Sequence, residues 1–229
     1  MNRAQQLPLA VRLRPQSRFA TFVSGDNAAL LRQLQGLTPG EQLFLWGPPA
    51  SGRSHLLQSV IAEAGDTACL LSGAELARGD PQMLQGLEQF RLLAIDDIDQ
   101  LAGNAAWEAA LFHLYNRLSG AAAIMLFAAA MAPAECGFML ADLRSRLAAG
   151  AVWQVRPLDD NGLAELLRRR AASLGLAMPE EVVRYLISRV PRDAAAITAL
   201  LDRLDTQALS HQRRLTIPFI QQLGGLTKL

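Results

Sequence analysis

The stretch GPPASGRS, from Gly47 to Ser54, decides the fold of this chain. It matches the phosphate-binding pattern G-x-x-x-x-G-K-[ST] except at Arg53, where the pattern has lysine. The run QLFLWG (42–47) before it is typical of a short buried strand, and SHLLQSVIAEAG (54–65) after it is typical of a helix that ends at glycine. This order favours phosphate binding, because loop N–H groups can wrap the anion while the positive end of the helix faces it.

Arg53 keeps the positive charge of the lysine, but it is bulkier, planar and forked. Every basic residue of the chain except Lys228 is arginine, so an arginine in a lysine position carries less meaning here than elsewhere. Gly47 and Gly52 permit the tight path of the loop, and the hydroxyl of Ser54 is a Mg²⁺ ligand candidate. The predicted nucleotide-binding residues of this region are Gly47, Pro48, Ala50, Ser51, Gly52, Arg53, Ser54 and His55.

A second piece of a nucleotide site is LLAIDD, in which an apolar run ends in Asp96 and Asp97. Asp96 is placed to hold Mg²⁺ through water, and Asp97 to orient an attacking water. Asp97 is a weak candidate, because it is one methylene shorter than the glutamate usual there. For the loop or the acidic pair alone, a purely structural role is about as good an explanation. The two together and in this order favour nucleotide binding.

Apolar runs and helical patterns alternate along the first two thirds of the chain. Further strands are predicted at 67–73, 91–99 and 122–130, and helices at 25–37, 74–79, 81–90 and 104–120. This alternation predicts an α/β fold, with a parallel sheet covered by helices on both faces.

The pattern changes at Pro157, after which only helices are predicted, at 159–175, 179–190 and 192–214. Residues 1–22 are basic, contain Pro8 and Pro15, and are predicted to be an extended arm. The predicted organisation is therefore an arm (1–22), an α/β domain (23–156) and a small helical domain (157–229).

Composition excludes several classes of protein. The net charge is only +1, so no global field draws the chain to DNA or to a membrane, although residues 1–24 contain four arginines and no acid. No apolar run is long enough for a signal peptide or a membrane span. Cys69 and Cys136 are far apart and the three histidines lack metal-ligand spacing, which favours buried thiols in a reducing cytoplasm.

Several stretches also carry a family resemblance: QLPLAVRL (6–13), FATFVSGDNAALL (19–31), LFLWGPPASGRSHLL (43–57), AIDDID (94–99), WEAALFHLYNRL (107–118), DLRSRL (142–147), PLDD (157–160) and RRLTIPFIQQLGGL (213–226). In these stretches the chain resembles the DnaA-related clade of AAA+ proteins and, within it, the Hda-like proteins. An arginine in the phosphate loop is a feature of that family. The resemblance implies an AAA+ P-loop core followed by an all-α lid.

The resemblance also implies a function. Hda-like proteins bind ADP, dock on the DNA-loaded sliding clamp of DNA polymerase III, and stimulate ATP hydrolysis by the initiator DnaA. The expected cofactors are thus ADP or ATP with Mg²⁺, and the expected partners are DnaA and the β clamp. Contact with DNA is expected to be indirect or weak, and no contact with a membrane is expected. Assembly into a homo-oligomer is left open. The expected location is the cytoplasm, in association with the nucleoid or the replisome. An initiator's helix-turn-helix domain is not expected, because the sequence stops at Leu229, directly after the lid helices.

Three groups of residues take their roles from the resemblance. The clamp-binding peptide is matched by Gln6, Leu7, Pro8, Leu9 and Ala10, where an ordinary terminus is the alternative. Arg146 matches the arginine finger that acts in trans on a neighbour's phosphate, and a surface arginine in a salt bridge is the alternative. Arg192 matches the lid arginine that senses nucleotide, and the segment 19–27 matches the part that closes around the base.

One position departs from the family. Ala130 stands where a polar residue, often aspartate, usually follows the fourth strand. Together with Arg53 and Asp97, it predicts a site that holds nucleotide but hydrolyses it weakly or not at all. The competing interpretations are an active AAA+ ATPase of the helicase-loader type and a plain DNA-binding module; the weakened catalytic residues disfavour the first, and the near-neutral charge disfavours the second.

Overall fold

The computed structural model describes residues 17–189, 193–211 and 216–222. The chain divides into two compact units, one with residues up to Ala20 and Ala29–Val155, the other with Thr21–Ala28 and residues from Arg156 onward. The predicted boundary lies one residue later, after residue 156, and the predicted first domain includes residues 23–28. The structure groups them with the second unit, where the side chain of Asn27 bonds the backbone of Arg156.

One five-stranded sheet forms the centre of the first unit, with its strands in the order β2-β3-β4-β1-β5 and every pair parallel. The strands are β1 (Gln42–Trp46), β2 (Ala68–Ser72), β3 (Leu92–Asp96), β4 (Ile124–Ala129) and β5 (Ala151–Gln154). The first four were predicted as buried apolar runs, and they are almost wholly buried. The edge strand β5 was not predicted, because its four residues are mostly exposed.

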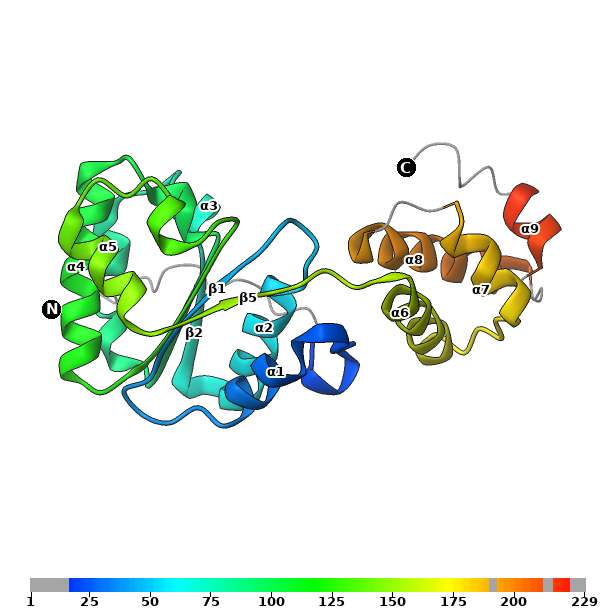
Figure 1. Cartoon of the computed structure of the whole chain (residues 1–229), viewed down its shortest axis with the longest axis horizontal. Helices are drawn as coiled ribbons and strands as arrows, with labels where there is room; N and C mark the ends of the chain where they lie inside the picture. The colour runs from blue at the N-terminus through cyan, green and yellow to red at the C-terminus, as the bar shows by residue number, and fades with distance from the viewer. Residues whose placement is uncertain (1–16, 190–192, 212–215, 223–229) are drawn as a thin grey trace, which may run out of the picture. The chain divides into compact units, whose positions relative to one another are not determined.

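Helices cover both faces of this sheet (Figure 1). They are α1 (Ala28–Gln35), α2 (Arg53–Ala64), α3 (Gly73–Leu76), α4 (Ala105–Gly120) and α5 (Ala141–Ala149). The helix α2 packs on one face, and α4 and α5 on the other, over a core that includes Phe44, Ile95 and Phe127. Short 3-10 turns connect these elements at Phe19–Thr21, Gly25–Asn27, Gly65–Thr67, Pro81–Leu84, Leu87–Gln89, Ile98–Leu101 and Pro133–Glu135.

The second unit contains α6 (Asp160–Ser173), α7 (Glu180–Ile187), α8 (Ala194–His211) and α9 (Ile217–Gln222). Three of these helices were predicted, whereas α9 has only six residues, too few to show a repeated helical pattern. Asp159 caps α6, since its Oδ1 accepts the N–H of Gly162 at 2.7 Å. The helices share a small apolar core of Leu163, Leu167, Ala171, Val182, Val183, Leu186, Ile197, Leu200, Leu201 and Ile220.

Cys69 and Cys136 are both buried free thiols. Burial raises the pKa of Cys69 to about 11 and that of Cys136 to about 12, so neither is a reactive thiolate at neutral pH. Among the helices of the described residues, none is both long and apolar enough to cross a membrane.

Candidate functional site

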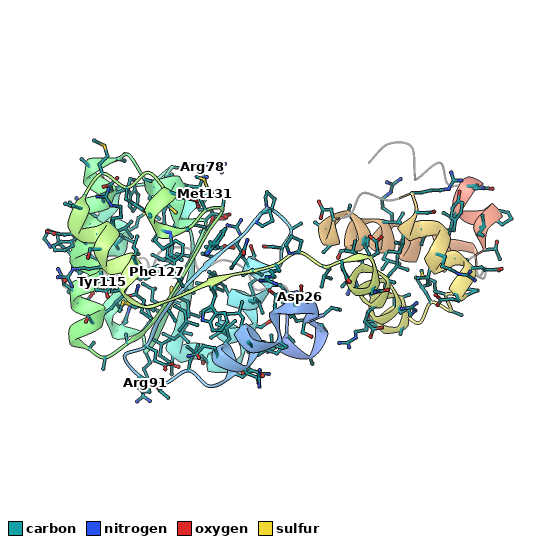
Figure 2. All side chains as sticks on the ribbon, in the orientation of Figure 1. Asp26, Arg78, Arg91, Tyr115, Phe127 and Met131 are labelled. Atoms are coloured by element: carbon teal, nitrogen blue, oxygen red, sulfur yellow. The ribbon has the colours of Figure 1, made fainter. Side chains whose placement is uncertain are left out.

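The phosphate-loop candidate connects the end of β1 with the start of α2, at the carboxyl edge of the sheet. Met131 and Arg78 lie at this edge and Arg91 at the opposite one (Figure 2). The loop is anchored to β4, because Gly47 N–H donates to the carbonyl of Ala129 at 3.3 Å. The carboxyl edge of a parallel sheet is where α/β folds bind their ligands.

Two glycines are needed for the path of this loop. A Cβ on Gly47 would collide with the carbonyl oxygen of Val155, and Gly52 has a φ of 103°, in the left-handed region. Pro48 and Ala50 shape the turn between them: Ser51 N–H donates to the carbonyl of Pro48 at 3.3 Å, and Ala50 has a φ of 59°. The backbone therefore bends tightly into the first turn of α2.

Two buried polar atoms of the loop, Ser51 Oγ and Arg53 Nη1, have no hydrogen-bond partner among the described residues. Such groups cost free energy unless a ligand or water satisfies them. The first N–H groups of α2 lack carbonyl partners within the helix, and its N-terminus carries partial positive charge. This donor set fits a phosphate group, which offers only acceptor oxygens.

Ser54 and Asp96, the residues predicted to hold Mg²⁺, lie side by side. Asp96 ends β3, and its carboxylate accepts a hydrogen bond from the side chain of Ser54. Burial raises the pKa of Asp96, although the Ser54 bond opposes this shift. No group of three His, Cys, Asp or Glu residues that could hold a metal occurs among the described residues, so Mg²⁺ here would need oxygen ligands from nucleotide and water.

Asp97 is turned toward the loop arginine. Its backbone has a φ of 49°, rare for a non-glycine residue, and its carbonyl lies so close to Gly73 that a Cβ there would collide with it. Its Oδ1 lies 3.4 Å from Nη2 of Arg53. Ala130, directly after β4, adds only a methyl group to this edge. The candidate for positioning water is thus paired with the cation of the loop.

The side chain of His55 contacts the segment that precedes α1. Its Nε2 lies 3.0 Å from the carbonyl oxygen of Arg18, while Arg18 Nη1 donates to the carbonyl of Ala62 at 3.2 Å. Burial lowers the pKa of His55, and the bond to Arg18 partly opposes this. His55 thus fastens residue 18 to α2.

Asn27 joins the segment 21–28 to the start of the second unit, a role that sequence reasoning missed. Its Nδ2 donates to the carbonyl of Arg156 at 2.9 Å, and its Oδ1 accepts the N–H of Arg156 at 2.8 Å. Both bonds are shielded, because Asn27 is 3% exposed. The available signal in the sequence was the stretch Gly25-Asp26-Asn27, in which two polar residues follow a glycine. The resemblance predicted that residues 19–27 close around the base of the nucleotide, and it named no single residue as a contact.

Arg146, the finger candidate, lies in the last turn of α5. Its guanidinium carbon is 5.0 Å from the ring centre of Phe112 and 5.3 Å from that of Tyr115, both on α4. These distances are within the range of cation–π attraction. The neighbouring Arg144 instead donates from Nη1 to the carbonyl of Phe138 at 3.2 Å. The two arginines of RSR thus have different surroundings, which their sequence does not reveal.

Glu108, which sequence reasoning also missed, holds the beginning of α5. This carboxylate is 1% exposed and accepts N–H groups of Gly103 (2.8 Å), Met139 (2.9 Å) and Leu140 (2.6 Å). An acidic residue on the buried side of a long apolar helix was the signal for such a role. Arg192 and the clamp-peptide residues Gln6, Leu7, Pro8, Leu9 and Ala10 lie outside the described residues.

Two family models match the chain. Residues 159–223 match the lid domain of Hda, and residues 79–154 match the bacterial DnaA ATPase domain. Together they span the second half of the sheet domain and most of the helical domain.

Solved structures show the same fold. Domain III of the replication initiation protein DnaA from Thermotoga maritima superposes with a TM-score of 0.79 at 20% identity, over 95% of this chain and 99% of that one. DnaA from Aquifex aeolicus, bound to AMPPCP, gives 0.73 at 19% identity, over 87% and 68%. A RuvB mutant from Thermotoga maritima gives 0.70 at 18% identity, over 92% and 71%. The predicted class, a parallel α/β sheet domain followed by an all-α lid, is confirmed.

Proposed function

This chain is an Hda-like, DnaA-related AAA+ protein with a role related to DNA replication, and from this premise we propose that it is a negative regulator of replication initiation. In the proposed role it holds ADP at Gly47–Ser54 and docks on the sliding clamp through its N-terminal arm. It then stimulates ATP hydrolysis by DnaA, by supplying Arg146 to the initiator's nucleotide in trans.

The geometry of the loop supports nucleotide binding. The backbone N–H groups and the guanidinium of Arg53 would hold the phosphates, while Ser51 Oγ offers a further donor. Ser54 and Asp96 would hold Mg²⁺, which neutralises phosphate charge when bound. The AMPPCP-bound DnaA structure shares this fold.

Weak intrinsic hydrolysis is part of the proposal. Asp97 pairs with Arg53 and has an unusual backbone conformation, and Ala130 has no polar group to offer. Each missing interaction with a transition state typically costs roughly 3 kcal/mol, so the combined losses would make hydrolysis slow. The site therefore fits a protein that retains its nucleotide without rapid hydrolysis, and it fits an ATPase of the helicase-loader type less well.

The surroundings of Arg146 are the single observation that carries the proposal. No salt bridge among the described residues involves this side chain, and its guanidinium lies on two aromatic rings. The alternative predicted from sequence was an arginine occupied by a surface carboxylate. An arginine without such a partner has no carboxylate to release before its N–H groups bind the phosphates of a neighbouring subunit, where fingers accelerate hydrolysis by about 10³-fold or more.

The peptide Gln6–Ala10 supports docking on the sliding clamp. It would place the glutamine in a polar notch and two apolar side chains in a hydrophobic pocket of the clamp. Docking there would bring the protein to the replisome in the cytoplasm, with DNA contacted indirectly through the clamp.

The proposal is tested by purifying the protein, measuring its retained nucleotide, and adding it to ATP-bound DnaA with DNA-loaded clamp. We expect retained ADP, co-elution with the clamp, and conversion of the initiator's ATP to ADP. The protein alone should hydrolyse ATP well below the roughly 1–10³ s⁻¹ usual for enzymes. Turnover in that range by the protein alone, with no effect on DnaA, would instead indicate a loader-type ATPase.

A further inference from the structure

The helix that carries Arg146 is fixed at both of its ends. At its beginning, the buried Glu108 of α4 accepts the N–H groups of Met139 and Leu140. At its end, the Nε2 of Gln42 donates to the carbonyls of Arg146 at 2.8 Å and of Leu147 at 3.0 Å. Helix C-termini leave such carbonyls without partners inside the helix. The backbone of the finger residue itself is therefore bonded to the first residue of β1.

Gln42 is in turn held by Tyr115. The hydroxyl of Tyr115 donates to Oε1 of Gln42 at 2.6 Å, and Gln42 is only 8% exposed. The residue after α5 also packs here, because a Cβ on Gly150 would collide with the backbone oxygen of Gln42. The side-chain amide of Gln42 is thus fixed in one orientation, with its oxygen toward Tyr115 and its nitrogen toward α5.

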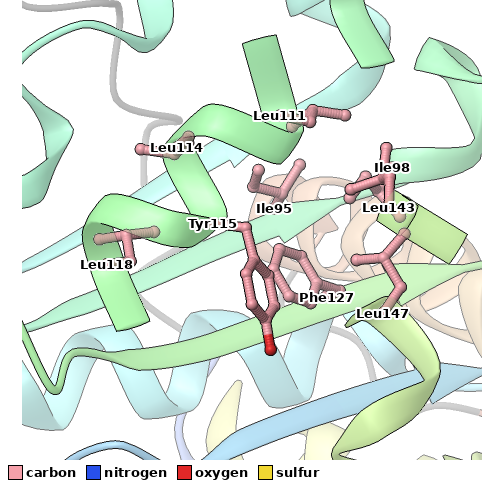
Figure 3. Close-up of a pocket in the computed structure, with 9 residues that line it drawn as sticks. All are labelled: Ile95, Ile98, Leu111, Leu114, Tyr115, Leu118, Phe127, Leu143 and Leu147. Atoms are coloured by element: carbon pink, nitrogen blue, oxygen red, sulfur yellow. The ribbon is translucent and has the colours of Figure 1, made fainter. Parts of the chain in front are cut away.

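Tyr115 is linked to the finger in two ways, directly through its ring and indirectly through its hydroxyl. The guanidinium of Arg146 lies 5.3 Å from the centre of its ring, while its hydroxyl reaches the Arg146 backbone through Gln42. Figure 3 shows the ring beside Phe127 in a small pocket that residues of α4, α5 and the sheet line, and the other lining residues are all apolar. Burial raises the pKa of Tyr115, although the charge of Arg146 opposes this, so the hydroxyl keeps its proton at neutral pH.

We propose that Tyr115 and Gln42 are positioning residues for Arg146, which fix its backbone and direct its guanidinium for action on the partner's nucleotide. This inference rests on the proposed function, since it concerns the same arginine. Neither residue needs to touch DnaA or its nucleotide. Because a misplacement of about 1 Å can cost roughly 10²-fold in rate, a finger on a freely moving helix end would be a poor catalyst.

The test is Tyr115→Phe, which removes the hydroxyl and keeps the ring beneath Arg146. Hydrolysis of DnaA-bound ATP is measured over a range of variant concentrations, with clamp and DNA present. We expect the maximal rate to fall by about 2- to 10-fold, the usual value of one hydrogen bond, while the half-maximal concentration stays unchanged. An unchanged maximal rate, or a loss confined to the half-maximal concentration, overturns the proposal.

The chain offers a closely matched control in Tyr185 of α7. The guanidinium of Arg189 lies 4.7 Å from the centre of its ring, and its hydroxyl accepts the Nε2 of Gln221 at 3.2 Å. Tyr185→Phe therefore removes an equivalent hydroxyl far along the sequence from α5. It should leave the maximal rate unchanged, and an equal loss in both variants contradicts a role specific to Arg146.

Gln42→Met gives a second, independent test, because it keeps the length of the side chain but removes its amide. It should also lower the maximal rate. The double variant with Tyr115→Phe should have a maximal rate only slightly below that of Gln42→Met alone, because both substitutions break the same series of hydrogen bonds. Additive losses contradict this. Unfolding curves identify any variant that fails to fold. If Gln42→Met fails to fold, Tyr115→Phe still tests the proposal.

Failure of this inference can be told apart from failure of the proposed function. If Arg146→Ala abolishes stimulation and Tyr115→Phe has no effect, Arg146 is the arginine finger and the positioning role of Tyr115 is wrong. If Arg146→Ala itself has no effect, the proposed function fails first, and the positioning role falls with it.

Discussion

Arg53 and Asp97 form an ion pair across the candidate phosphate site, with 3.4 Å between Nη2 and Oδ1. The arginine side chain is only 10% exposed, and its second terminal nitrogen, Nη1, is buried without a hydrogen-bond partner among the described residues. Burying a charge costs free energy unless it is paired and hydrogen-bonded, so Arg53 has an incomplete set of partners. A phosphate group at the loop would complete this set.

The first prediction concerns Arg53→Ala, which removes the cation next to the expected phosphates. Charged hydrogen bonds contribute about 1.5–3 kcal/mol, so the dissociation constant for ADP should rise by roughly 10- to 100-fold. Calorimetric titration with ADP and Mg²⁺ measures this. Arg91→Ala is the control: Arg91 is exposed at the other edge of the sheet and should not affect binding (Figure 2). If wild type, Arg53→Ala and Arg91→Ala bind ADP with equal affinity, the nucleotide binds at another site.

The second prediction is that Asp96→Asn separates stability from Mg²⁺ binding. Burial raises the pKa of Asp96 in the folded protein, so folding favours the protonated form. The stability from this carboxyl is present below its unfolded pKa of about 3.8 and is lost as pH rises through the folded pKa. At pH 7 the neutral amide should therefore raise the melting temperature of the protein without nucleotide.

The same variant should lose the Mg²⁺-dependent part of its ADP affinity, because an amide is a weaker ligand than a carboxylate. Titration in EDTA is the control, and there wild type and variant should bind ADP alike. A lower melting temperature together with unchanged Mg²⁺ dependence is the contradicting result.

The third prediction is a pH dependence of stability that comes from His55. Burial lowers its folded pKa, so protons bind preferentially to the unfolded chain. Its contribution to the free energy of unfolding is present above the unfolded pKa of about 6.5 and declines as pH falls through 6.5 toward the folded pKa. Urea unfolding between pH 7.5 and 5.5 should show a smaller decline for His55→Gln. The same slope in wild type and in His55→Gln speaks against this account.

The fourth prediction is that replacing Gln6, Leu7 and Leu9 by Ala abolishes binding to the sliding clamp. These side chains supply the amide and the apolar groups that the clamp peptide would use. Surface-immobilised clamp measures the interaction, and ADP affinity and thermal stability serve as checks on the fold. Arg12→Ala with Arg14→Ala tests for simple charge attraction by the same arm and should retain binding. Clamp binding that survives the triple change assigns docking to another surface.

The sequence predicted the elements whose signals are local. Strands β1 and β3 are continuous apolar runs that end at Gly47 and at Asp96, and the loop between β1 and α2 has its own glycine pattern. By contrast, β5 is mostly exposed and exists through pairing with Leu43–Trp46 of β1. The helix α5 buries only Leu143 and Leu147, which gives too thin an apolar stripe to identify.

The residues of the candidate site were predicted better than their contacts. Ser54 and Asp96 were expected at one Mg²⁺ site and do lie side by side. The pairing of Asp97 with Arg53 was not expected, because it depends on the left-handed backbone of Asp97 and the close approach at Gly73. The bonds from Gln42 to α5 join residues more than a hundred positions apart, and no local pattern encodes such a contact.

The most direct test of the central claim is conversion of DnaA-bound ATP to ADP by Arg146→Ala, with DNA-loaded clamp present. The variant should keep clamp binding, ADP binding and thermal stability, and should lose stimulation by about 10³-fold or to background. Arg146→Lys should largely fail as well, since one ammonium cannot replace the planar fork, whereas Arg144→Ala should do less harm. Full stimulation by Arg146→Ala would contradict the account, because either the finger is another residue or the protein does not inactivate DnaA.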